Sequence, residues 1–198
     1  MLDTADLIAL LGSRICHDLI SPIGAISNGV ELLMMDGGSM SPEIALIAES
    51  VANANARIRF FRVAFGASSA DQRIGRAEVV SILTDLTRGG RLTIEWRCPE
   101  DLPRNEVKIA FLLIQCMETA MAFGGRVSVD HVGGKWVITG SAAKFKIDQD
   151  LWDGLAYGTA LPDVTAAHVH FALVLIELRS QNRTLTTNLA QSEISVRF

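Results

Sequence analysis

The stretch RICHDLISP, Arg14–Pro22, sets a histidine beside an aspartate inside a long segment with helical periodicity. A helix turns by about 100° per residue, which aligns apolar residues along one side. The aligned residues are Ile15, Leu19, Pro22, Ile26, Val30 and Leu33. His17 lies roughly 200° from Ile15, so the pattern predicts that the stripe is buried and that His17 faces solvent.

The neighbours of His17 favour a chemical role over a plain surface position. Asp18 adjoins it, and the small residues Ser21 and Gly24 share its face and leave the ring approachable. Pro22 removes a helical hydrogen bond just after the histidine, at a cost of roughly 3 kcal/mol. A merely solvated histidine would not call for that cost, although the surface interpretation stays open.

Residues 1–68 are expected to form a helical hairpin. A first helix over about 3–35 ends at the glycines of DGGSMSP, and Pro42 suits the first turn of a second helix ending near Phe65. Two helices of about 40 Å cannot enclose an apolar seam of that length. A second copy could close it into a four-helix bundle, so we predict a homodimer.

Residues 75–198 mix helical and strand-like segments, which predicts an α+β sandwich after the α-helical hairpin. GASSADQRIG is expected to be the linker. Strands are expected in RLTIEWRC, in a hairpin turning at Gly133–Gly134, and in two short segments at the end. Helices are expected over 77–87, 105–123 and 165–181. The predicted domains are therefore 1–68 and 75–198.

Composition excludes several classes of function. A net charge of −4 argues against non-specific nucleic-acid binding. We see no leader peptide and no apolar run of about 18 residues, so neither export nor a membrane anchor is expected. Cys16, Cys98 and Cys116 are too few and too widely spaced for a metal or disulfide framework, and we expect free thiols in a reducing cytoplasm.

HDLISP, with His17, Asp18 and Pro22, resembles the phosphoacceptor motif on the first helix of sensor histidine kinases. The longer string RICHDLISPIGAISNGVELL, together with RVAFGAS after it, resembles more specifically the ChpT-type histidine phosphotransferases of alphaproteobacteria. This resemblance covers essentially the whole chain. It implies that 1–68 is a dimerisation and phosphoacceptor domain and that 75–198 is a degenerate kinase-ATPase-like domain.

The departures from a kinase support that interpretation. The asparagine-rich helix of a kinase is matched by Gln115, Thr119, Ala122 and Phe123, without the metal-holding asparagine or the lysine. VITGSAAKF lacks the aspartate that reads adenine. PDVTAAHVHFALVL lacks the glycines whose backbone cradles phosphates. We therefore expect no ATP binding and no cofactor.

The resemblance implies that the receiver domain of a hybrid histidine kinase phosphorylates His17. The phosphoryl group would then pass to receiver domains of response regulators, which control the cell cycle in the best-known systems. Neutral imidazole is a good nucleophile near pH 7, and we expect Asp18 to orient its ring. Mg²⁺ is expected from the receiver's acidic pocket. Arg14 either pairs with phosphate oxygens or is an ordinary solvated arginine, and Ser21 either bonds the phosphoryl group or is simply small.

Two rival functions remain open at this point. A working kinase with unusual nucleotide motifs predicts saturable binding of an ATP analogue. A pseudo-kinase scaffold that docks receiver domains without phosphotransfer predicts that His17 is dispensable.

Overall fold

The computed structural model describes residues 20, 23–24, 26–35, 42–69, 71–159, 161 and 165–198. The chain divides into two compact units. Unit 1 comprises Met1–Ala67 with Ser81–Leu86, and unit 2 comprises Ser68–Val80 with Thr87–Phe198. The division in the chain near residue 67 lies close to the expected domain boundary, but Ser81–Leu86 groups with the first unit.

Unit 1 contains two helical stretches of the predicted hairpin. Residues 26–35 are helical, and α2 covers Pro42–Ala64, which agrees with the predicted second helix. Unit 1 also takes in the second half of α3 (Arg76–Thr87). The guanidinium of Arg59 on α2 donates to Asp85 at 3.0 Å and to Ser81 at 3.2 Å, so a half-exposed ion pair ties α2 to α3.

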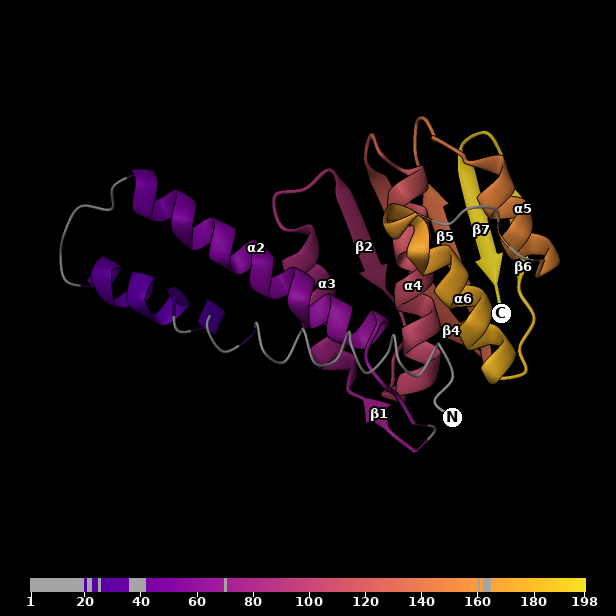
Figure 1. The fold of residues 1–198 in the computed structure, drawn as a ribbon, viewed down its shortest axis with the longest axis horizontal. Coiled ribbons are helices and arrows are strands. Elements are labelled where there is room, and N and C mark those ends of the chain that lie inside the picture. Colours follow the sequence, from indigo (N-terminus) through magenta and orange to yellow (C-terminus); the bar gives the residue numbers. More distant parts are fainter. Residues whose placement is uncertain are drawn as a thin grey trace. The chain divides into compact units, whose positions relative to one another are not determined.

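Unit 2 is built on a five-stranded sheet of order β2-β4-β5-β7-β6 (Figure 1). The strands are β2 (Leu92–Trp96), β4 (Gly125–Val132), β5 (Lys135–Ser141), β6 (Thr186–Leu189) and β7 (Glu193–Arg197). Only the β2–β4 pair is parallel within this sheet, and the other pairs are antiparallel. The helices α4 (Arg104–Ala120) and α6 (Val169–Ser180) pack on each other and lie over one face of the sheet (Figure 1).

The predicted β-hairpin is confirmed. Gly133 and Gly134 separate β4 from β5 and have φ of 59° and 76°. Positive φ at both central residues is the conformation of a type I′ turn, whose twist matches that of the two strands. Glycine adopts it without steric cost, which explains why the dipeptide lies there.

Buried and exposed residues alternate along the strands, which gives the sheet a core face and a solvated face. Val127, Val129, Ile138, Ile194 and Val196 are fully buried, and their neighbours along each strand are mostly polar. The three tryptophans, Trp96, Trp136 and Trp152, are core residues. Helix α4 is buried on most of its sides because the sheet and α6 enclose it. Its apolar sequence suits this position.

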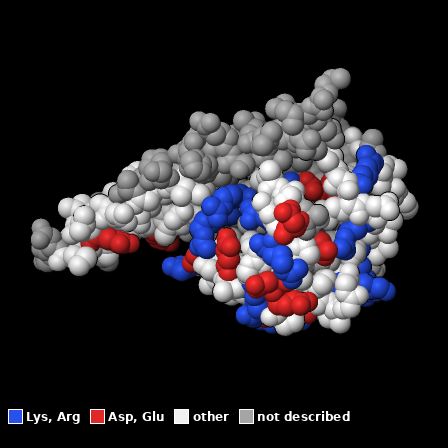
Figure 2. All heavy atoms as spheres, turned by 90° about the horizontal axis from the view of Figure 1, so that it is seen from below, with Lys and Arg blue, Asp and Glu red and all other residues white. Residues whose placement is uncertain are grey.

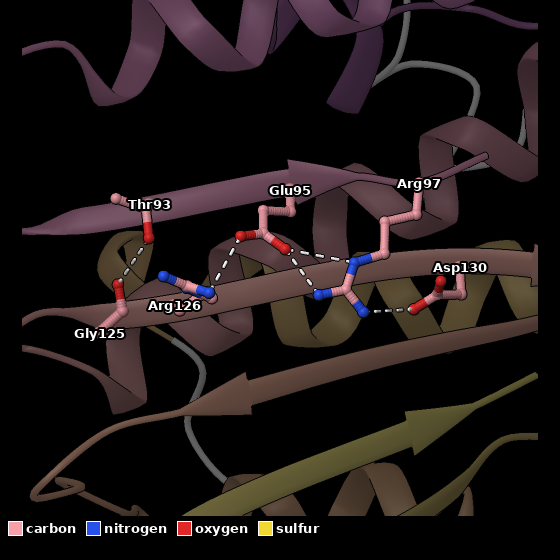
Figure 3. A network of polar contacts seen from close by, with 6 residues as sticks. All are labelled: Thr93, Glu95, Arg97, Gly125, Arg126 and Asp130. Atoms are coloured by element: carbon pink, nitrogen blue, oxygen red, sulfur yellow. Dashed lines mark hydrogen bonds and ion pairs between the residues drawn. The ribbon is translucent and has the colours of Figure 1, made fainter. Parts of the chain in front are cut away.

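The solvated face carries a chain of ion pairs between β2 and β4 (Figure 3). Arg97 lies 2.6 Å from Glu95 and 3.8 Å from Asp130, and Arg126 lies 3.2 Å from Glu95. These side chains are a third or more exposed, so each pair stabilises the fold only weakly. Their arrangement nevertheless favours the observed register of the edge strand β2.

Four elements differ from the sequence predictions. The expected linker contains β1 (Arg73–Ile74), which pairs with β3 (Leu102–Pro103). The long helix stops at Ala120 rather than Phe123. An additional helix, α5 (Gln149–Tyr157), begins at Asp148, whose carboxylate accepts from the Leu151 amide, and ends at Gly158 in the left-handed conformation.

The described helices include none that is both long and apolar enough to cross a membrane.

An ion pair buried between α4 and α6 gives a test of this packing. Lys108 Nζ lies 2.6 Å from Glu177 Oε1, with the two side chains 5% and 14% exposed. We expect Lys108→Met to lower the free energy of unfolding by about 3 kcal/mol, because Glu177 is left buried without its partner. The double variant Lys108→Met/Glu177→Leu should regain most of this loss in urea unfolding. A double variant no more stable than Lys108→Met would show that the unpaired Glu177 is not the cause of the loss.

Candidate functional site

The four residues predicted to carry the chemistry, Arg14, His17, Asp18 and Ser21, lie outside the described residues. Their roles therefore stay predictions. The structure does describe the part of the first helix that follows them, and its exposed and buried faces can be compared with the predicted position of His17.

The apolar stripe of the first helix is only partly covered within one chain. Val30 is 8% exposed, but Ile26 is 51% exposed and Leu33 is 61% exposed. On the second helix, Ile47 is 48% exposed. Two helices can bury only the faces they turn toward each other, and these side chains lie beyond that contact.

A second group of exposed residues lies on the face predicted for His17. At about 100° per residue, Met35 falls in line with His17, Asn28 within about 20° and Leu32 within about 60°. Leu32 is 67% exposed and Met35 is 82% exposed. Between residues 28 and 35, the side of the helix that is in line with His17 is thus partly apolar and exposed.

Charge on the hairpin is one-sided. Between Ile15 and Ala56 the sequence contains no lysine or arginine. Its acidic residues there are Asp18, Glu31, Asp36, Glu43 and Glu49. In Figure 2 the described end of the hairpin correspondingly shows acidic and uncharged side chains but no basic ones. A partner that docks here meets an apolar to acidic surface.

Two glycines interrupt the first helix where its own chain does not require them. A Cβ atom added at Gly24 or at Gly29 meets nothing within 4 Å, and neither glycine has a positive φ. Glycine inside a helix is less favourable than alanine by about 1 kcal/mol. Packing within the described chain does not offset this cost.

In unit 2, a hydrogen-bonded pair occupies one of the positions that match the asparagine-rich helix of a kinase. The Thr119 hydroxyl donates to the Gln115 carbonyl at 2.9 Å, and its oxygen lies 3.1 Å from His170 Nε2. With that hydroxyl proton engaged, Nε2–H of His170 is the group that donates to Thr119. His170 is 6% exposed, and burial, together with the nearby charge of His168, lowers its pKa to about 4. Helices α4 and α6 are thus joined directly by side chains.

Helix α5 adds further apolar contacts to α6. Trp152 is 1% exposed and meets the Phe171 ring edge-on, with the centroids 5.7 Å apart. At the other end of α6, Arg183 lies 2.7 Å from Glu106, which also accepts from Trp136 Nε1 at 2.8 Å. These contacts fill the space beside α4 with protein side chains.

The Thr119–His170 pair was not predicted from the sequence. Among the described residues, no three His, Cys, Asp or Glu side chains are grouped as a metal site. Residues 51 positions apart leave no local signal of contact, whereas the cap at Asp148 and the glycine at 158 were readable signals for α5.

Comparison with known proteins places this fold and motif in a family. A family model described as the histidine phosphotransferase C-terminal domain matches residues 76–193. The chain belongs to the histidine phosphotransferase family, and it is therefore a phosphotransferase that acts in a phosphorelay of two-component signalling.

One relative of this chain is the protein phosphotransferase ChpT of Brucella abortus (strain 2308). It is 36% identical over 185 residues, which cover 89% of this chain and 88% of that protein. A solved structure described as a bacterial phosphotransferase matches with a TM-score of 0.71 and 29% identity, covering 100% of this chain and 97% of that one. The ChpT-type resemblance is confirmed.

The pKa of His170 gives a test of unit 2 through pH. The unfolded chain takes up a proton on this ring near pH 6.5, whereas the folded chain resists protonation until about pH 4. Acid therefore favours the unfolded state, and we expect about 3 kcal/mol of stability to be lost as the pH falls from 6.5 to 4. His170→Gln, which keeps a donor for Thr119 but does not titrate, should remove this part of the loss in chemical unfolding measured at several pH values. Equal losses in wild type and His170→Gln would contradict the assignment.

Proposed function

We propose that His17 accepts a phosphoryl group from the receiver domain of a hybrid histidine kinase and passes it to receiver domains of response regulators. The observation that carries this proposal is the motif HDLISP, which the sequence pattern predicts to lie on an exposed helix face, in a chain of the histidine phosphotransferase family. Control of the cell cycle is the process that the family resemblance favours for these regulators.

The other histidines support this choice of acceptor. His170 is buried, with its Nε2 engaged by Thr119. The His131 ring packs on Trp136 with centroids 4.8 Å apart. His168 packs edge-on to Phe171, with Thr165 at 3.5 Å from its Nδ1. None of these three described histidines has a carboxylate as its next residue, whereas His17 is followed by Asp18.

In the proposed transfer, Nε2 of neutral His17 attacks the phosphorus of the receiver's aspartyl phosphate. A P–N bond forms as the P–O bond to the aspartate breaks, and the aspartate leaves as a carboxylate. Asp18 accepts from Nδ1–H, which holds the ring in the reactive tautomer and stabilises the positive charge that develops on it. Arg14 and Ser21 are proposed to contact the phosphoryl oxygens. Reversal of the same step on a second receiver returns His17 to its neutral form, and Mg²⁺ belongs to the receiver's own acidic pocket.

We propose that unit 2 binds no ATP. The expected asparagine position is Thr119, engaged with His170, and Trp152 and Phe171 fill space beside α6 with apolar rings. A triphosphate needs a backbone cradle or cations, and the segment before α6 offers no glycine for such a cradle. The phosphoryl group must then come from another protein.

A homodimer closes the hairpin in this proposal. Ile26, Leu33 and Ile47 are each about half exposed or more in one chain, and burying them in a four-helix bundle is favourable by about 25 cal/mol per Å² of apolar surface. The receiver then docks on the remaining face, where Asn28, Leu32 and Met35 are open.

Transfer from a labelled receiver tests the function. A phosphorylated receiver domain of a hybrid kinase from the same organism, mixed with the protein without ATP, should rapidly give acid-labile label on the wild type and none on His17→Ala. Asp18→Asn should label at least tenfold more slowly, because the carboxylate no longer balances the charge on the ring. Absence of label on the wild type with several receivers would instead favour a scaffold that only docks receiver domains.

Substitution of one exposed residue tests the docking face. Met35→Glu should slow transfer from the receiver at least tenfold by placing a charge in an apolar contact, while leaving the helical content unchanged. Val132→Glu is the matched control, since Val132 is similarly exposed, at 77% against 82%, but lies at the β4–β5 turn of unit 2. Equal transfer rates for Met35→Glu and wild type would place the docking surface elsewhere.

A further inference from the structure

Gly29 lies on the apolar face of the first helix, and no contact within the described chain explains why this position is a glycine. It lies within the helical residues 26–35, its φ is not in the left-handed region, and an added Cβ would meet nothing within 4 Å. Alanine would fit the same backbone and favour the helix more. Contacts within the described chain therefore give no reason for glycine at this position.

The surroundings of Gly29 indicate what that surface is like. Around the helix, Gly29 lies about 60° from Ile26 and about 40° from Leu33. These two side chains are 51% and 61% exposed, so the glycine is a hollow between large apolar groups. Within residues 26–35 the one charged residue is Glu31, which points about 160° away, so this stretch of the sector is uncharged.

A second copy of the chain suits this sector better than a receiver. The hairpin carries only acidic charge between residues 15 and 56, so two copies can meet without repulsion only through an uncharged face. The sector around Gly29 is such a face, and it continues the exposed stripe of Ile26 and Leu33. His17 lies about 120° from Gly29, so the face proposed for the receiver remains separate.

We propose that the helices of the second copy pass closest to the first helix at Gly29, where the missing side chain lets an apolar group of the partner enter the hollow. The distance between packed helices depends on the side chains at the contact, so a methyl group at this position would force the two copies apart. This inference rests on the proposed homodimer and adds where its contact is tightest.

The test compares Gly29→Ala with Gly24→Ala. Both substitutions are made in the same helix, both positions have open space for a Cβ within the chain, and alanine favours the helix equally at both. Sedimentation of the full chain over a dilution series gives the dimer dissociation constant of each variant, and circular dichroism checks that helical content is retained. We expect Gly29→Ala to raise the dissociation constant about tenfold or more, and Gly24→Ala to change it less than twofold.

The outcomes separate this inference from the homodimer itself. A dimeric wild type whose dissociation constant is unchanged or lowered in Gly29→Ala overturns the role of Gly29 and leaves the homodimer standing. A wild type that is monomeric at micromolar concentration overturns both. If Gly29→Ala loses helical content, Gly29→Ser replaces it under the same criterion.

Discussion

Two helices share only one mutual face, and the hairpin of this protein carries more apolar surface than that face covers. Val30 is buried within the chain, whereas Ile26 and Leu33 on the same stripe are more than half exposed. Burial of this exposed apolar surface against a partner surface would be favourable. The proposed dimer, the separate face for the receiver and the position of the acceptor histidine all depend on this constraint.

Unit 2 buries its apolar surface within one chain, whereas the hairpin leaves part of its apolar surface exposed. Its sheet buries one face under α4 and α6, and the two helices are joined by Lys108–Glu177 and by Thr119–His170. Thr119, at one of the positions that match the asparagine-rich helix of a kinase, is engaged with His170, whereas the Gln115 Oε1 atom is buried without a hydrogen-bond partner. This arrangement is what a domain needs if its fold is retained while phosphoryl chemistry is carried out elsewhere in the chain.

Much of unit 2 was predictable because its signals are local. Alternation and the Gly133–Gly134 turn specify the β4–β5 hairpin, and the apolar run of α4 specifies a buried helix. The β1–β3 pair was missed because two-residue strands have no measurable period, and α5 was missed because no element was assigned to its nine residues. For the site the balance is reversed: HDLISP predicts the acceptor from the sequence, and the structure contributes the exposure of Ile26, Leu32 and Met35 further along the same helix.

The position of the phosphoryl group after transfer tests most directly whether His17 is the acceptor. The chain has four histidines, at 17, 131, 168 and 170, and peptide mass spectrometry at alkaline pH after reaction with a phosphorylated receiver can distinguish them. If His17 is the acceptor, we expect a phosphoryl group on the peptide that contains His17 and on no other. A phosphoryl group on His131, His168 or His170, with His17 unmodified, would contradict it.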